Sequence, residues 1–206
     1  MSLFIPTYFA PISQYAAIYQ SDSVIFEFED NFQKQTYRNR CYIYGANGRL
    51  TLNIPVKHAS KESRKKTKNT TVDNDSRWQQ QHFKSLQSAY RSSPFFDFFE
   101  EDLAKIFSKK YTYLHDVNID THLFITDALQ IDSSFSKTEN YEITPAIVNY
   151  RSLAIAKNGI KVKVDSYIQM FDDKYGFIPN LSILDLLFME GPNAISFLEK
   201  PNIIVN

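Results

Sequence analysis

The chain has 206 residues, of which 43% are hydrophobic and 22% charged, the composition of a folded protein with a sizeable core. Lysine plus arginine equals aspartate plus glutamate at 23 each, so no overall charge attracts nucleic acid or an anionic membrane surface. Cys41 is the one cysteine in the sequence, which excludes an internal disulfide and a cysteine-rich metal site.

Segments that direct a protein into or across a membrane are not indicated. No run approaches the roughly 18 to 20 continuous apolar residues that a spanning helix needs. The first residues lack the basic stretch, apolar run and small-residue cleavage site of a signal peptide. We therefore expect a cytoplasmic protein without a membrane span.

The first part of the chain has the pattern of a βαβ unit. Residues 3–5 are apolar, residues 12–19 have helical spacing, and residues 24–28 alternate like a strand. Such a unit pairs its strands in parallel, and ligands bind at the carboxyl edge of parallel sheets. The loop 6–11, which contains Tyr8, is therefore expected at a ligand-binding edge, where its ring or hydroxyl contacts the ligand.

A β-hairpin is predicted next, because Asn47-Gly48 is a strong signal for a type I′ turn. The predicted pairing joins 36–44 to 49–57, with even positions opposite odd ones. One face then carries Cys41 and Ile43 and belongs to the core. The opposite face carries a polar and aromatic set: Arg38, Arg40, Tyr42 and Tyr44.

Residues 57–77 lose the hydrophobic pattern and are rich in charge. Between Lys57 and Lys68 there are six basic residues and one acidic residue. We interpret the segment as a long mobile loop, too polar to pack, of the kind that often forms a lid. A polyanion-binding loop is the alternative, although few aromatic residues are present to stack on bases.

The second half of the chain is dominated by helical patterns. The helices are predicted at 78–90, 94–113, 119–130, 183–189 and 193–198. Residues 132–165 are ambiguous, with a strand-like alternation at 160–164. The fold class predicted is α/β: a mixed sheet with an N-terminal βαβ unit and β-hairpin, followed by a mostly helical C-terminal half.

A single domain spanning 1–206 is expected from these patterns. It divides into a sheet-forming core region at 1–57, a mobile basic loop at 58–77 and a mainly helical portion at 78–206.

The clearest candidate site is the polar segment 33–40. Lys34, Arg38 and Arg40 place three cations between apolar segments. One guanidinium group can donate two parallel hydrogen bonds to two oxygens of a phosphate, and a lysine adds a point charge. The segment therefore predicts a site for an anionic ligand. Tyr42 is expected to contribute an aromatic contact. The alternative is a solvated face, or ion pairing with the nearby acidic residues Glu27, Glu29 and Asp30.

Three further polar residues have two interpretations each. Asn39 is a structural clamp or a ligand contact, because a buried asparagine must be hydrogen-bonded. Asp30 is a general base beside the cations or a charge-balancing partner. His82, on the apolar stripe of the helix 78–90, is a core histidine with one hydrogen bond or a general base. The histidines have no metal-ligand spacing, so we expect neither a metal nor a cofactor.

Several motifs resemble those of the WbqC-like family. They are 4–12 (FIPTYFAPI), 31–40 (NFQKQTYRNR), 45–48 (GANG), 78–82 (WQQQH), 85–91 (SLQSAYR), 94–96 (PFF) and, as in Bacteroides-type members, 176–188 (GFIPNLSILDLLF). The resemblance implies a role in bacterial O-antigen or other surface-polysaccharide biosynthesis. Aminoacyl or acyl transfer onto an amino sugar has been supposed for the family, and no catalytic residues carry over from it.

Two hypotheses of different class follow. In the first, the protein is a transferase that binds a nucleotide-activated sugar: segment 34–40 holds the diphosphate, and His82 or Asp30 moves the proton. In the second, it is a non-catalytic module that binds a glycan or a protein partner through the basic loop. Nucleic acid is not expected as a partner, and the oligomeric state is left open.

Overall fold

A computed structural model describes residues 1–57, 65–157, 159 and 163–199 of the chain. Its principal sheet has four strands, β1 (Ser2–Phe4), β2 (Val24–Phe26), β5 (Phe135–Lys137) and β6 (Val148–Asn149), in the order β5-β2-β1-β6. All of the pairings are parallel. The predicted βαβ unit is confirmed: α1 (Ile12–Tyr19) connects β1 to β2, and nearly all of its residues are buried.

The strand order reverses at β1. From β1 the chain proceeds outward to β2 and β5, and then returns to place β6 on the other side of β1. This is the arrangement of a doubly wound sheet, in which the crevice at the carboxyl ends of the strands beside the reversal is the usual ligand site. In this chain that crevice lies between the ends of β1 and β6.

The hairpin forms a separate two-stranded sheet from β3 (Arg40–Gly45) and β4 (Gly48–Asn53). The even-to-odd register is confirmed, since Tyr42 pairs with Thr51 and Gly45 with Gly48. The turn is not type I′, however. Its central residues are Ala46 and Asn47, and the positive φ falls on Gly48 alone, at 90°. Type I′ needs positive φ at both central positions.

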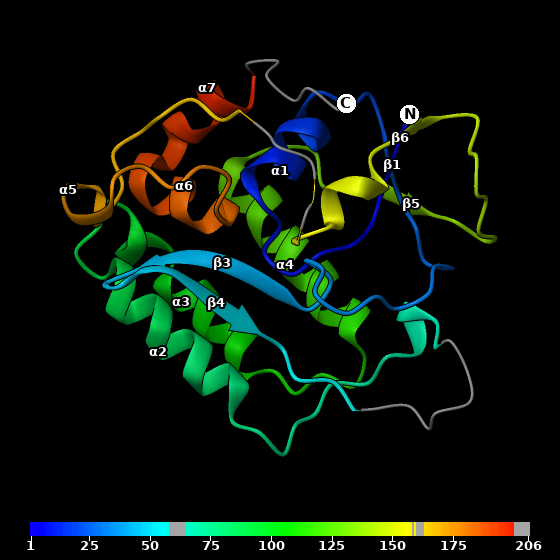
Figure 1. Cartoon of the computed structure of the whole chain (residues 1–206), viewed down its shortest axis with the longest axis horizontal. Helices are drawn as coiled ribbons and strands as arrows, with labels where there is room; N and C mark the ends of the chain where they lie inside the picture. The colour runs from blue at the N-terminus through cyan, green and yellow to red at the C-terminus, as the bar shows by residue number, and fades with distance from the viewer. Residues whose placement is uncertain (58–64, 158, 160–162, 200–206) are drawn as a thin grey trace.

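The hairpin lies between helices. The bounds of the helices are α2 (Trp78–Tyr90), α3 (Phe96–Ser108), α4 (Leu114–Leu129), α5 (Asp172–Tyr175), α6 (Ile183–Glu190) and α7 (Ala194–Leu198), with 3-10 turns η1 (Thr67–Asn69), η2 (Arg151–Ala154) and η3 (Gly191–Asn193). β3 packs against α2 on one side and α6 on the other, as Figure 1 shows. None of the helices in the described ranges has the length and apolar character needed to cross a membrane.

The helix predictions hold best where the apolar stripe is regular. The predicted helix 78–90 is confirmed at both ends as α2. The helix predicted at 119–130 begins earlier, at Leu114, because its first turns bury polar residues, His115 and Asn118, which mask the apolar pattern. The helix predicted at 94–113 is shorter, and ends at Ser108.

The basic segment packs more than its composition predicts. Of this segment the structure describes Lys57 and residues 65–77, and the rest of the expected loop lies outside the described residues. The described part contains η1 and is attached by bridges between Val56 and Val72 and between Thr71 and Tyr113. These backbone pairings allow a polar segment to pack.

Two strands lie in the stretch that was ambiguous in the sequence. β5 and β6 have three and two residues, too few to show a period of two. The strand expected at 160–164 falls mostly outside the described residues. The α/β class is confirmed, with the parallel sheet and the hairpin as separate sheets.

Candidate functional site

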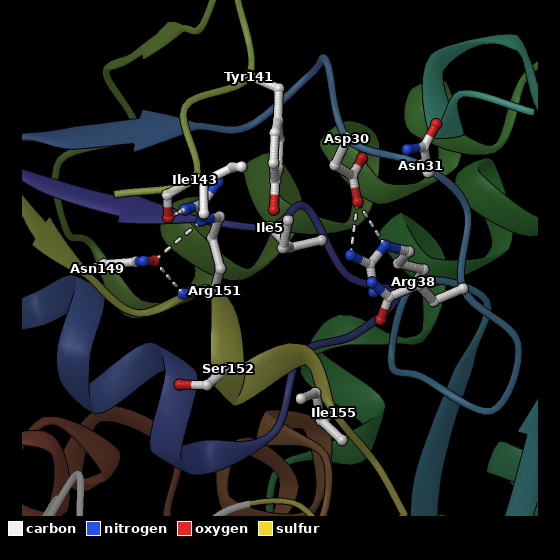
Figure 2. Close-up of a pocket in the computed structure, with 11 residues that line it drawn as sticks. Ile5, Asp30, Asn31, Arg38, Tyr141, Ile143, Asn149, Arg151, Ser152 and Ile155 are labelled. Atoms are coloured by element: carbon white, nitrogen blue, oxygen red, sulfur yellow. Dashed lines mark hydrogen bonds and ion pairs between the residues drawn. The ribbon is translucent and has the colours of Figure 1, made fainter. Parts of the chain in front are cut away.

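A cavity of about 490 Å³ lies at the carboxyl edge of the parallel sheet, at the reversal of strand order. Ile5 directly after β1 and Asn149 at the end of β6 belong to its lining, as do Arg151 and Ser152 of η2. Figure 2 shows Asp30 and Arg38 on one side and Arg151 with Asn149 on the other, with the Tyr141 ring between them. The volume is in the range of small-molecule sites.

The first polar wall is an ion pair between Arg38 and Asp30. The Asp30 Oδ2 atom accepts hydrogen bonds from Arg38 Nη2 at 2.5 Å and from Arg38 Nε at 2.9 Å. Both side chains are buried. Arg38 Nη1 has no hydrogen-bond partner among the described residues, so one arm of the guanidinium is unused in the protein.

Backbone contacts hold this wall in place. Asn118 of α4 donates from Nδ2 to the carbonyl oxygens of Arg38, at 2.9 Å, and Pro6, at 3.0 Å. The Thr67 amide donates to the carbonyl of Asp30 at 3.0 Å. The helix α4, the loop after β1 and the basic segment therefore all fix the position of the pair.

The second polar wall is built around Arg151. Its Nη1 donates to the buried Glu27 Oε2 at 3.2 Å, its Nε to Asn149 Oδ1 at 3.0 Å, and its Nη2 to the Ile143 carbonyl at 3.1 Å. The guanidinium carbon also lies 4.7 Å from the centre of the Tyr141 ring. Arg151 thus connects the ends of β2 and β6 to the segment between β5 and β6.

Each wall pairs a cation with a carboxylate. Burial raises the pKa of the Asp30 carboxyl above its ordinary value, and the charge of Arg38 opposes this effect. A carboxylate with a raised pKa is a better proton acceptor. Because Nη1 and Nη2 of a guanidinium carry two N–H groups each, both arginines keep donors that their protein partners do not use.

The chemistry of this lining suits a polar ligand that carries an anionic group. Two guanidinium groups supply charged donors, and Asn31, Gln33 and Ser152 supply neutral ones. No group of histidine, cysteine and acidic side chains in the described ranges has the arrangement of a metal site.

The structure brings together two of the predicted site residues in the cavity, Arg38 and Asp30. Lys34 is exposed, and neither it nor Arg40 is part of the cavity lining. Tyr42 is half-buried on the hairpin, where its ring contacts the Tyr37 ring at 5.6 Å and lies under Arg49 at 4.7 Å. The segment 34–40 therefore does not converge on one hollow, because β3 begins only at Arg40 and the turns before it prevent Arg38 and Arg40 from sharing a strand face.

The remaining predicted residues are buried in the protein interior. Asn39 donates from Nδ2 to the carbonyl of Ile54 at 2.9 Å, as a clamp between the strands would. The Tyr8 hydroxyl is hydrogen-bonded to His82 Nδ1 at 2.9 Å. Burial lowers the pKa of His82 to about 4. Neither Tyr8 nor His82 lines the cavity.

Arg151, Asn149 and Tyr141 were missed by sequence reasoning. They lie in the stretch without clear periodicity, and Arg151 is far in sequence from Arg38. Once β6 is known, the signal is simple: Asn149 and Arg151 follow a strand at the carboxyl edge of a parallel sheet.

The fold and the cavity together define a class: an α/β protein with a small doubly wound sheet and a polar cavity at its point of reversal. Within that class, the chain belongs to the WbqC-like protein family, whose model matches residues 6–158. The match includes every charged residue of the cavity.

Comparison with characterised proteins adds no closer assignment. No protein of curated function matches the chain, and no solved structure matches it either. Membership of the WbqC-like family suggests a role in polysaccharide-related biosynthesis.

Proposed function

We propose that this protein binds a nucleotide-activated sugar in the cavity between Arg38 and Arg151, as a step in bacterial surface-polysaccharide biosynthesis. The observation that carries the proposal is the pair of guanidinium groups on opposite walls of a cavity at the reversal of the sheet. Diphosphate is the group of a nucleotide-activated sugar that arginine recognises best. The family membership supports the sugar-related part.

The two arginines hold the diphosphate through the donors that Asp30 and Glu27 leave free. Their carboxylate partners keep the guanidinium groups in fixed positions before the ligand arrives, which lowers the entropy cost of binding. The Tyr141 ring supplies an aromatic surface at the cavity, and Ser152 and Asn31 supply hydrogen bonds to sugar hydroxyls.

The reaction proposed is transfer of an acyl or aminoacyl group onto an amino sugar. The sugar nitrogen attacks the carbonyl carbon of an activated acyl donor, the new C–N bond forms, and the donor's leaving group departs. Asp30 accepts the proton that the nitrogen loses. Asp30 takes this role rather than His82 because it lines the cavity.

Isothermal titration calorimetry with a panel of nucleotide-sugars tests the binding. The expected result is saturable binding that Arg151→Lys weakens roughly tenfold or more, because lysine keeps the charge and loses the fork of donors. Arg49→Lys is the matched control, since Arg49 lies on the hairpin over Tyr42. Failure of every nucleotide-sugar to bind tighter than about millimolar contradicts the proposal.

The alternative, a glycan- or partner-binding module that uses the basic segment, makes the opposite prediction. In the described part of that segment, Lys66 and Lys68 are both paired with Glu29, which reduces their charge toward a partner. Neutralising Lys57, Lys61, Arg64 and Lys65 by glutamine should leave nucleotide-sugar binding intact. If the glutamine replacements in the basic segment abolish the function of the protein in the cell and Arg151→Lys does not, the result supports the binding module instead.

A further inference from the structure

A second hollow, of about 290 Å³, lies over the first turn of α4. Its walls come from Phe28 after β2, Lys137 at the end of β5, and the chain that leads into α4. None of its lining residues belongs to the first cavity. The second hollow is therefore separate from the first cavity.

His115 is the unusual residue in this hollow. It lies in the first turn of α4, is 3% exposed, and packs its ring on Phe28 at 4.4 Å between centroids. Neither ring nitrogen has a hydrogen-bond partner among the described residues. Buried polar groups are nearly always hydrogen-bonded, so such a residue points to a partner outside the described part of the chain.

The other buried histidines of the described chain provide the contrast. His82 is bonded to the Tyr8 hydroxyl at 2.9 Å, and His122 to the Tyr15 hydroxyl at 3.3 Å. Burial lowers the pKa of both, and of His115, to about 4. All three are therefore neutral imidazoles at neutral pH, and His115 differs from the others in having no hydrogen bond to a hydroxyl of the described residues.

The charges around His115 favour an anion. Lys110 and Lys137 form no ion pair with any described residue, and the Lys137 ammonium lies 4.6 Å from the centre of the Phe28 ring. Lys109 is paired with Asp120 at 2.5 Å. Asp116 at the rim is exposed and opposes an anion, and the two unpaired lysines outnumber it.

We propose that this hollow is a second ligand site, which takes the phosphate or carboxylate group of a small molecule through His115, Lys110 and Lys137. The anionic group accepts from the two ammonium groups and from the imidazole N–H. Phe28 and Ile119 contact the less polar part of the ligand. The site stands independently of the first cavity and of the sugar proposed for it.

Nuclear magnetic resonance of the imidazole groups in the full chain tests this site, with inorganic phosphate as the probe and chloride at equal ionic strength as the reference. Phosphate is expected to shift the His115 signals in a saturable way, while those of His82 and His122 stay in place. The combined change Lys110→Gln and Lys137→Gln should weaken this response on the order of tenfold.

The control is Lys105→Gln, which removes an exposed lysine on α3 that is paired with Asp102. It should leave the phosphate response unchanged. Acetate in place of phosphate distinguishes the two sources: a stronger response to acetate assigns the site to a carboxylate-bearing molecule, and a stronger response to phosphate assigns it to a phosphorylated one.

Two results overturn the proposal. One is an unmoved His115 signal in tens of millimolar phosphate and acetate. The other is an equal shift of all three buried histidines, which indicates a general salt effect. Since His115 itself is not replaced, a failure of folding cannot obscure the answer, and the readout does not depend on whether the first cavity binds a nucleotide-sugar.

Discussion

Arg38 is buried and lines the cavity, so its charge must be compensated inside the protein. Asp30 provides this compensation through two hydrogen bonds to one carboxylate oxygen. The same pairing holds the guanidinium in a fixed position. The ion pairing with a nearby acidic residue, which the sequence left open as the alternative, is therefore observed for Arg38, and any ligand bound by Arg38 must use the donors that remain.

Removal of Asp30 tests this dependence. Asp30→Ala leaves the Arg38 charge buried without a partner and should lower the free energy of unfolding by about 3 to 5 kcal/mol. Arg91→Ala breaks an exposed pair with Glu100 and should cost about 0 to 1 kcal/mol. Urea denaturation of both variants measures the difference. Equal losses contradict the assignment of Asp30 and Arg38 as a buried, coupled pair.

At the scale of the elements, Asp185 of α6 connects segments that are distant in sequence. Its carboxylate accepts hydrogen bonds from Tyr90 of α2 at 2.6 Å, Tyr167 at 2.5 Å and Gln169 at 2.8 Å. The Tyr90 hydroxyl in turn accepts from the Tyr44 amide of β3. Burial raises the pKa of the Asp185 carboxyl, while its three donors oppose this effect.

This network predicts a graded effect of mutation. Asp185→Ala leaves three buried donors without an acceptor and should cost about 3 kcal/mol or more of unfolding free energy. Tyr90→Phe removes one hydroxyl and should cost roughly 1 to 2 kcal/mol. Urea denaturation again measures both. A smaller loss for Asp185→Ala than for Tyr90→Phe contradicts the central place of the carboxylate.

The whole molecule is expected to lose stability in acid, because its buried histidines resist protonation. The pKa of His82, His115 and His122 falls from an ordinary value of 6.5 to about 4 in the folded protein. Between these values the unfolded chain binds more protons, so folding stability decreases as the pH falls through this window. The effect is on the order of 3 kcal/mol for each histidine.

Unfolding free energies measured at a series of pH values between about 7 and 4 test this expectation. Asp30 and Asp185 act in the opposite direction, since a buried carboxyl with a raised pKa favours the folded state as it becomes protonated. His122→Phe should make the decrease shallower. A stability that stays constant across the window contradicts the expected neutral state of the three imidazoles.

The C-terminal region belongs to the same packed structure, although the family model ends at residue 158. Ile183 donates its amide to the Ala10 carbonyl, and Ser182 to the Tyr42 carbonyl. α7 packs against α1, as seen at the top of Figure 1. The loop after β1 and the hairpin are thus supported by a segment outside the matched range.

The sequence by itself determined the elements with a regular period. Strand, helix and strand at the start of the chain, the register of the hairpin and the bounds of α2 all follow from alternation or from a 3.6-residue stripe. It also pointed to the carboxyl edge of the sheet, where the structure has its polar cavity. These features depend on neighbouring residues, which a sequence displays directly.

Only the tertiary structure decided which side chains meet at that edge. β5 and β6 are too short to show a period, yet their positions in the sheet bring Tyr141 and Arg151 to the cavity that Arg38 also lines. The burial of Arg38 with Asp30, and of His115 without a hydrogen-bond partner among the described residues, depends on helices and loops from distant parts of the chain. Solvent exclusion arises from long-range packing, and local sequence does not encode it.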